Sequence, residues 1–240
     1  MTQWLLALET SGRTGSLALL VDGELVEERR LDETGRRHAQ TLVAELDALV
    51  RRQGLTPKAL AAVAVSRGPG SFTGLRVGIV CAKTLAWSAG IPLLAMDTFP
   101  VIAENAGAEH ATVHVVDDAQ RGDLFVGTYQ RSVDGRFVST GPLVIRPAEQ
   151  WVAGVDAAHL VLGPVVPRLM DVEPPEPILQ SRLATEPWQN QPQAREVGRL
   201  AWERLQRGEA DDLWTVGPFY LRASAAEEKW DATHGTPAGG

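Results

Sequence analysis

The segment Leu5-Leu6-Ala7-Leu8-Glu9, followed by a second apolar run at residues 16–21 and then by Asp22-Gly23, indicates how this chain is built. Residues 5–8 have the composition of a buried strand, and residues 16–21 and 24–30 predict two more strands. Asp22-Gly23 is typical of a type I′ hairpin turn. Because strands joined by short turns are antiparallel, we expect the sheet to begin with three antiparallel strands.

After these strands, helices and strands alternate. Apolar residues at helical spacing and closing glycines predict the elements, which are helices over 38–53, 75–88 and 98–106 and strands over 61–65 and 92–95. Strands that are joined by a helix run parallel. Antiparallel strands followed by parallel ones are the pattern of an RNase H-like lobe, which fits within residues 1–106.

The opening pattern then recurs. Val113-His114-Val115-Val116 is followed by Asp117 and Asp118, by a second strand and by Asp134-Gly135, as Leu5–Leu8 is followed by Glu9 and later by Asp22-Gly23. This order predicts an internal duplication, and the fold class is then α/β, with mixed sheets flanked by helices. The predicted parts are a first lobe over 1–106, a second, degenerate lobe with a C-terminal helix over 107–208, and an extension over 209–240 whose Gly/Pro-rich end at 233–240 is expected to be disordered.

The segment Arg67-Gly68-Pro69-Gly70-Ser71-Phe72-Thr73-Gly74-Leu75-Arg76 is the most informative of the chain. Its glycines allow a tight turn whose amides could bind an anion in front of the following helix. The alternative is a plain connector between strand and helix, with Ser71 or Thr73 as the N-cap. No Lys-Ser/Thr pair closes the segment, so it is not a P-loop.

The following helix carries small residues at every fourth position: Gly74, Gly78, Ala82 and Ala86. Such a stripe lets another element approach closely. Its partner is either the sheet of the same chain or another subunit. The helix is apolar nearly all round, so we expect cover on two sides and place the stripe in a subunit contact.

Composition limits the function classes. The chain of 240 residues is 44% hydrophobic and 22% charged, as in ordinary globular proteins, and no stretch approaches the roughly 20 apolar residues of a membrane helix. The net charge of −7 disfavours unaided binding to nucleic acid. No signal peptide is visible, and the single cysteine, Cys81, excludes an intrachain disulfide, so we expect a cytoplasmic protein.

Catalytic constellations are not predicted. His110 and His114 have the spacing of a metal-binding pair on a helix, but residues 111–116 predict a strand, in which the two would lie about 13 Å apart. We therefore expect no metal. Cys81 lies within an apolar helix and is expected to be a core residue. Ser71 has no evident His/Asp relay, so no catalytic residue is assigned.

The run from Gly68 to Gly78, GPGSFTGLRVG, followed by Ala82-Lys83, resembles the signature of the TsaB (YeaZ-type) family. The segments 6–11, 118–122 and 218–222 match that family in the same order, and the resemblance spans about residues 4–229. It implies an actin-like (ASKHA) fold of two RNase H-like lobes. It also implies a non-catalytic partner of TsaD, which transfers a threonylcarbamoyl group to N6 of the tRNA adenosine next to the anticodon (position 37).

Further expectations follow from the resemblance. The partners are a TsaD-type catalytic subunit and a TsaE-type ATPase, with tRNA reached only through the complex, and the free chain forms a homodimer. No cofactor is intrinsic, although a nucleotide could bind at a partner interface. The expected partner interface comprises His38, Leu42, Leu46, Gly74, Arg76, Gly78, Ala82 and Ala86.

A vestigial nucleotide or anion site is the second expected site. Actin-like ATPases place an acid on the first turn of each lobe, as Glu9 and either Asp117 or Asp118 are placed here. The expected residues of this site are Glu9, Thr10, Ser11, Gly68, Gly70, Ser71 and Asp118. No lysine lies near either turn. The alternative function is an autonomous actin-like small-molecule kinase or ATPase.

Overall fold

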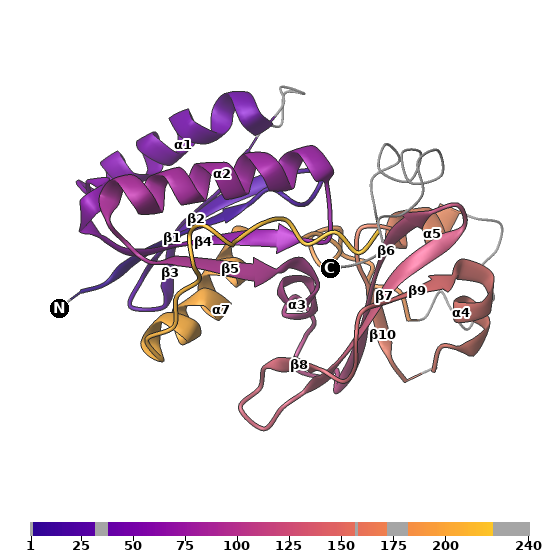
Figure 1. Cartoon of the computed structure of the whole chain (residues 1–240). Helices are drawn as coiled ribbons and strands as arrows, with labels where there is room; N and C mark the ends of the chain where they lie inside the picture. The colour runs from indigo at the N-terminus through magenta and orange to yellow at the C-terminus, as the bar shows by residue number, and fades with distance from the viewer. Residues whose placement is uncertain (1, 32–37, 157, 172–181, 223–240) are drawn as a thin grey trace, which may run out of the picture.

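The computed structural model describes residues 2–31, 38–156, 158–171 and 182–222, and it contains two mixed sheets (Figure 1). The first sheet has the order β3-β2-β1-β4-β5. Its strands are β1 (Trp4–Glu9), β2 (Gly15–Val21), β3 (Glu24–Leu31), β4 (Leu60–Gly68) and β5 (Leu93–Asp97). The first three strands are antiparallel, whereas β4 and β5 run parallel to β1, as predicted. Asp22 and Gly23 both have positive φ, as a type I′ turn requires.

Helices cover both faces of this sheet. Helices α1 (His38–Arg52) and α2 (Phe72–Ala89) pack on one face, and α7 (Ala194–Gln206) packs on the other (Figure 1). Alternation along β1 explains both layers, because Leu6 and Leu8 contribute to the core under α1 and α2, whereas Leu5 and Ala7 contribute to the core under α7. Although α7 follows the second sheet in the sequence, it thus completes the core of the first.

The second sheet has the order β10-β6-β7-β8, and β9 pairs with β7. Its strands are β6 (Thr112–Gln120), β7 (Asp123–Arg131), β8 (Phe137–Ser139), β9 (Val144–Pro147) and β10 (Leu160–Leu162). Neighbouring β6, β7 and β8 are antiparallel, and β10 is parallel to β6. The order repeats that of β4-β1-β2-β3, and the connection through Asp134-Gly135 joins β7 to β8 as Asp22-Gly23 joins β2 to β3. The predicted α/β fold with an actin-like, RNase H-like strand order is therefore confirmed.

Some predicted boundaries differ from the observed ones. The helix predicted from residue 75 begins at Phe72, because the Ser71 hydroxyl accepts a hydrogen bond from the Gly74 amide and caps the helix one turn earlier. The helix predicted over 98–106 is α3 (Thr98–Ala103). Short elements complete the fold: η1 (Pro57–Ala59), α4 (Ala148–Gly154) and α5 (Val166–Asp171). The predicted disordered end at 233–240 lies outside the described residues.

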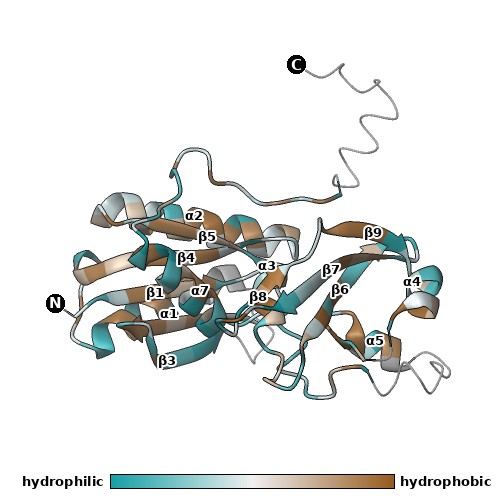
Figure 2. Ribbon diagram, turned by 90° about the horizontal axis from the view of Figure 1, so that it is seen from below, coloured by the Kyte–Doolittle hydropathy of each residue, from teal (hydrophilic) through white to brown (hydrophobic). Residues whose placement is uncertain are grey.

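An extended segment, residues 209–222, runs back from α7 past β5 and α2 toward the second sheet (Figure 2). We call it the C-terminal strap. The Asp211 amide donates to the Leu93 carbonyl, and the Phe219 amide donates to the Arg67 carbonyl at 2.7 Å. Among the described residues, no helix has the length and apolar character needed to span a membrane.

Candidate functional site

An apolar groove lies between α1 and α2, on the side that faces away from the first sheet. Its volume is about 660 Å³. It is lined by Leu42, Val43, Leu46, Arg76, Val77, Val80, Cys81, Thr84, Leu85 and Ser88. Most of these side chains are apolar, so water in the groove finds few hydrogen-bond partners. We call this surface the α1–α2 groove.

Three large apolar side chains on these two helices are in solvent. Val43 is 65% exposed, Val80 is 62% exposed and Trp87 is 68% exposed. Val80 and Trp87 are seven residues apart, which places them on one face of α2. Apolar patches of this kind on a helix pair mark interaction surfaces more often than scattered single residues do.

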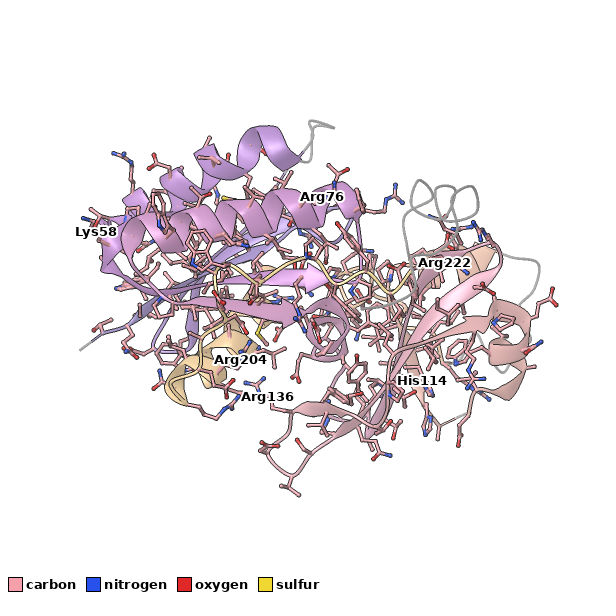
Figure 3. The ribbon with its side chains drawn as sticks, viewed as in Figure 1. Lys58, Arg76, His114, Arg136, Arg204 and Arg222 are labelled. Atoms are coloured by element: carbon pink, nitrogen blue, oxygen red, sulfur yellow. The ribbon has the colours of Figure 1, made fainter. Side chains whose placement is uncertain are left out.

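The predicted partner interface overlaps this groove only in part. Leu42 and Leu46 line it but are almost completely buried, at 1% and 7% exposure. Arg76 is exposed and borders the groove near the start of α2 (Figure 3). Its guanidinium lies 3.9 Å from the centre of the Phe72 ring, and its Nε donates to the Tyr220 hydroxyl at 3.2 Å. His38 begins α1, and its side chain lies outside the described ones.

The small-residue stripe does not face a partner, which corrects the sequence prediction. Gly74, Gly78, Ala82 and Ala86 are all buried within the chain. A Cβ atom on Gly74 would lie 1.9 Å from the Thr10 carbonyl oxygen, and one on Gly78 would lie 2.0 Å from Thr10 Oγ1. The stripe therefore lets α2 approach the end of β1. The second face of α2, which the sequence also predicted to need cover, is the one that carries Val80 and Trp87.

The turn after β1 is closed by a carboxyl group of its own chain. Glu9 is completely buried, and its Oε1 accepts hydrogen bonds from the amide and hydroxyl of Ser11 and from the Gly12 amide. Burial raises the pKa of Glu9, and the bonds from Ser11 and Gly12 oppose that rise. A phosphate group at this turn would need the same amides. The Glu9 carboxyl group therefore already accepts the hydrogen bonds that an anionic ligand would need.

The glycine-rich segment closes over the same turn. The Ser71 amide donates to the Ser11 carbonyl at 2.8 Å. A Cβ on Gly70 would lie 2.6 Å from that carbonyl oxygen, and one on Gly68 would lie 2.6 Å from the Phe219 carbonyl oxygen. Both glycines have positive φ, so side chains are excluded by conformation as well as by space. The segment thus acts as the connector, with Ser71 as N-cap, and its close contacts are with the chain itself.

Asp118 does not join this cluster. Its carboxylate forms an ion pair with Arg168 of α5 and accepts a hydrogen bond from the Gln120 amide. Its neighbour Asp117 is a half-buried acid of the second sheet, and desolvation raises the pKa of Asp117 to about 6. The structure therefore brings Glu9, Thr10, Ser11, Gly70 and Ser71 together and leaves Asp118 with a different partner.

The histidines and the cysteine that the sequence offered as candidates make local contacts and packing contacts. Residues 112–120 form a strand, as predicted, and His114 contacts His159 (Nε2 to Nδ1, 3.0 Å) and Thr128 (Nδ1 to Oγ1, 3.0 Å) rather than His110. Within the described ranges, no three His, Cys, Asp or Glu side chains are grouped as a metal site requires. Cys81 packs against the first core, and burial raises the pKa of its thiol.

The sequence reasoning did not place Val43, Val80 or Trp87 in the expected interface. Their signal was present, because positions 80 and 87 are apolar but fall outside the stripe of small residues. The stripe drew attention because glycine inside a helix is unusual. Only the structure shows which side of α2 packs against the sheet and which side is exposed to solvent.

Comparisons with known proteins identify the relatives of this chain. The chain matches the family described as TsaD: tRNA N6-adenosine threonylcarbamoyltransferase over residues 32–159, which is slightly more than half of its length. It is 28% identical to the tRNA threonylcarbamoyladenosine biosynthesis protein TsaB of Bacillus subtilis (strain 168), over 94% of this chain and 97% of that protein. It is 31% identical to TsaB of Escherichia coli (strain K12), over 55% of this chain and 57% of that protein. The solved structure of YeaZ from Pseudomonas aeruginosa superposes with a TM-score of 0.74 at 28% identity, over 91% of this chain and all of that one.

Proposed function

This chain belongs to the TsaB (YeaZ-type) family, and we propose that it acts in the biosynthesis of threonylcarbamoyladenosine on tRNA as a non-catalytic subunit. In this role it binds a TsaD-type transferase and makes that subunit competent to modify the adenosine next to the anticodon. The main support is the α1–α2 groove with its exposed Val43 and Val80, together with the exposed Trp87 on the same face of α2 as Val80. A partner that covers these side chains would remove a large apolar area from water.

The turn after β1 supports the non-catalytic part of the proposal. The amides of Ser11 and Gly12, which would hold a phosphate, are already bound by the Glu9 carboxylate. Asp118, the acid of the second turn, is paired with Arg168. A nucleotide would have to displace both arrangements to bind here as it does in an actin-like ATPase.

Several features of the assembly belong to the same proposal. The free chain forms a homodimer through the α1–α2 groove, since one apolar surface serves both self-association and the heteromeric contact. A TsaE-type ATPase joins the complex, and any nucleotide binds at a partner interface rather than to an intrinsic site. The net charge of −7 is the reason that tRNA is reached only through the complex, which works in the cytoplasm.

A matched pair of substitutions tests the interface. Val80→Glu places a carboxylate in the proposed contact, where it would be buried without a partner, and we expect the Kd for a TsaD-type subunit to rise about 30-fold or more. Val133→Glu is the control, because Val133 is fully exposed on the β7–β8 connection, away from the groove. Titration calorimetry with the full chain measures both. An unchanged Kd for Val80→Glu, with an unchanged melting temperature, would remove the groove from the proposal.

A second measurement separates the proposal from the alternative of an autonomous ATPase or kinase. The purified chain alone is incubated with ATP and the released phosphate is measured, and tRNA modification by a TsaD-type subunit is measured with and without the chain. We expect no phosphate release from the chain alone and modification only when it is present. Sustained ATP turnover that disappears in Glu9→Ala would instead favour the ATPase.

A further inference from the structure

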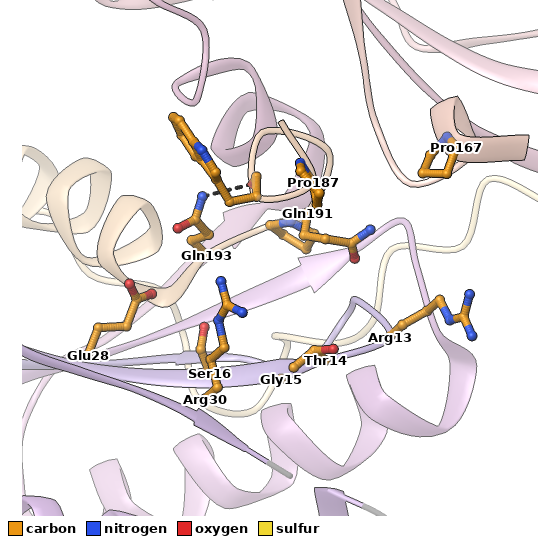
Figure 4. Close-up of a pocket in the computed structure, with 12 residues that line it drawn as sticks. Arg13, Thr14, Gly15, Ser16, Glu28, Arg30, Pro167, Pro187, Gln191 and Gln193 are labelled. Atoms are coloured by element: carbon orange, nitrogen blue, oxygen red, sulfur yellow. Dashed lines mark hydrogen bonds between the residues drawn. The ribbon is translucent and has the colours of Figure 1, made fainter. Parts of the chain in front are cut away.

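A second cavity lies beside β3, separate from the α1–α2 groove, and has a volume of about 480 Å³ (Figure 4). Its walls come from the turn between β1 and β2, from β3, from the start of α5 and from residues 187–193. Cavities of this size between parts of a chain are typical of small-molecule sites. We call it the Arg30 cavity. None of its walls belongs to α1 or α2.

The charge in the Arg30 cavity is only partly compensated. The guanidinium of Arg30 rises from β3 toward residues 187–193 (Figure 4) and forms no hydrogen bond or ion pair with any residue in the described part of the chain. Arg13, which has an interaction partner of its own, also lines the cavity. The acid in the same wall, Glu28, already accepts a hydrogen bond from the Arg195 amide at 3.1 Å and lies 3.7 Å from its Nε. The cavity therefore presents positive charge to a ligand.

The opposite wall combines apolar rings with two amide side chains. The rings are those of Trp188, Pro167, Pro187 and Pro192, and the amides belong to Gln191 and Gln193. Trp188 is 40% exposed, so much of its surface is open to solvent. Indole and proline rings are the side chains on which planar ligands stack, and an exposed tryptophan gains most from such cover.

The segment that carries Trp188 is held in place by buried amide side chains. The Asn105 Nδ2 donates to the carbonyls of Gln189 and Gln191, at 3.1 and 2.8 Å. The Gln193 Nε2 donates to Asn105 Oδ1 and to the Trp188 carbonyl, at 2.9 and 3.0 Å. Because residues 188–193 are fixed before any ligand arrives, little ordering is required on binding.

From this juxtaposition we propose that the Arg30 cavity binds a small planar organic anion, in which a phosphate or carboxylate group is attached to an aromatic ring. The anionic group pairs with Arg30, and the ring packs against Trp188 and the prolines. Inorganic phosphate would satisfy only the arginine, and a neutral ring would satisfy only the apolar wall. The site is independent of the proposed partner contact and does not depend on the proposed function.

Titration calorimetry of the full chain with four probes tests the proposal. Phenyl phosphate and benzoate carry both a ring and an anion, whereas inorganic phosphate and phenol each carry one part. We expect the two planar anions to bind and the two partial probes to bind at least about tenfold more weakly. Inorganic phosphate binding as tightly as phenyl phosphate, or no binding of either planar anion, would overturn the proposal.

Substitutions locate the binding. Arg30→Gln removes the charge from an exposed strand position, and Trp188→Leu removes the ring, and each is expected to weaken binding of phenyl phosphate about tenfold or more. Arg146→Gln is the control, because Arg146 is an exposed arginine on β9 that does not line the cavity. Melting temperatures show that each variant is folded. Equal affinity of wild type and Arg30→Gln would place any observed binding elsewhere and refute the assignment.

Discussion

Two carboxyl groups lie at corresponding places, the buried Glu9 at the end of β1 and the half-buried Asp117 near the end of β6. Glu9 is opposite Ser16 of β2, and Asp117 is opposite Phe125 of β7. Burial raises the pKa of both groups. Glu9 accepts hydrogen bonds from the amides of Ser11 and Gly12 in the turn that follows it, and Asp117 accepts one from the adjacent Asp118 amide. The acids that the sequence analysis related to nucleotide binding therefore accept hydrogen bonds from backbone amides in the structure.

The raised pKa of Asp117 predicts how its replacement depends on pH. The folded pKa of about 6 is above the ordinary value of 3.8, so this carboxyl contributes stability below pH 4 that is lost as the pH rises through 6. Asp117→Asn does not titrate, and its Oδ1 still accepts the bond from the Asp118 amide. We expect the free energy of unfolding of the variant, relative to wild type, to be about 2 kcal/mol higher at pH 8 than at pH 4.5, because one pKa unit corresponds to about 1.4 kcal/mol and the unfolded carboxyl is already largely ionised at pH 4.5.

Urea unfolding of both proteins at the two pH values measures this difference. The comparison cancels every other titrating group that the two proteins share. A variant whose stability relative to wild type is the same at pH 4.5 and pH 8 would show that Asp117 does not ionise over this range in the folded chain.

At the scale of elements, α2 is fixed by its contact with Thr10. The glycines at 74 and 78 meet different atoms of that residue, the carbonyl oxygen and Oγ1 respectively. The backbone at Thr10 cannot move without disturbing β1, whereas a side-chain oxygen can be removed by substitution. The two glycines thus offer a test of why α2 carries a small-residue stripe.

We expect Gly74→Ala and Gly78→Ala each to lower the free energy of unfolding by about 1–3 kcal/mol, although alanine favours a helix. Thr10→Ala removes Oγ1 and should rescue most of the loss in Gly78→Ala. It should not rescue Gly74→Ala, since the carbonyl stays. Chemical unfolding of the single and double variants gives the coupling energies. Gly154→Ala is the control, because a Cβ there has no neighbour within 4 Å. Equal rescue of both glycines, or of neither, would contradict this account of the stripe.

The elements show how far the sequence could predict the fold. Strand order followed from local signals, because Asp22-Gly23 requires a hairpin and intervening helices require parallel strands. The side of α2 that faces the sheet did not follow, since both sides are apolar and periodicity alone cannot rank them. Contacts between distant residues, such as His114 with His159 or Asn105 with residues 189–191, left no local pattern. The Arg30 cavity, assembled from four separate segments, was hidden for the same reason.

At the scale of the whole molecule, the two sheets are tied together by side chains as well as by the chain itself. Arg136, on the connection between β7 and β8, forms ion pairs with Glu104 after α3 and Glu203 of α7 (Figure 3). The side chain of Glu104 is only 6% exposed, so this pairing compensates a buried charge. The C-terminal strap makes the second tie, and it contacts α2 on its way through Lys83, which donates to the Val216 carbonyl at 2.9 Å.

The end of the strap is attached to the second sheet by Arg222, and this attachment gives the last prediction. Its guanidinium donates to the Ala119 carbonyl and pairs with Asp123 at 3.0 Å, on either side of the β6–β7 turn (Figure 3).

Arg222→Ala removes charged hydrogen bonds worth about 1–2 kcal/mol here, so amides of residues 118–126 should exchange with deuterium about 5- to 30-fold faster, while those of β1 and β4 are unchanged. Mass spectrometry of exchanged peptides measures both regions. Arg207→Ala is the control, since Arg207 pairs with nearby Glu209 at the surface and its loss should leave both regions as in wild type. If exchange at the turn does not change in Arg222→Ala, the strap does not stabilise the second sheet, and its role is limited to its contacts with α2 and β5.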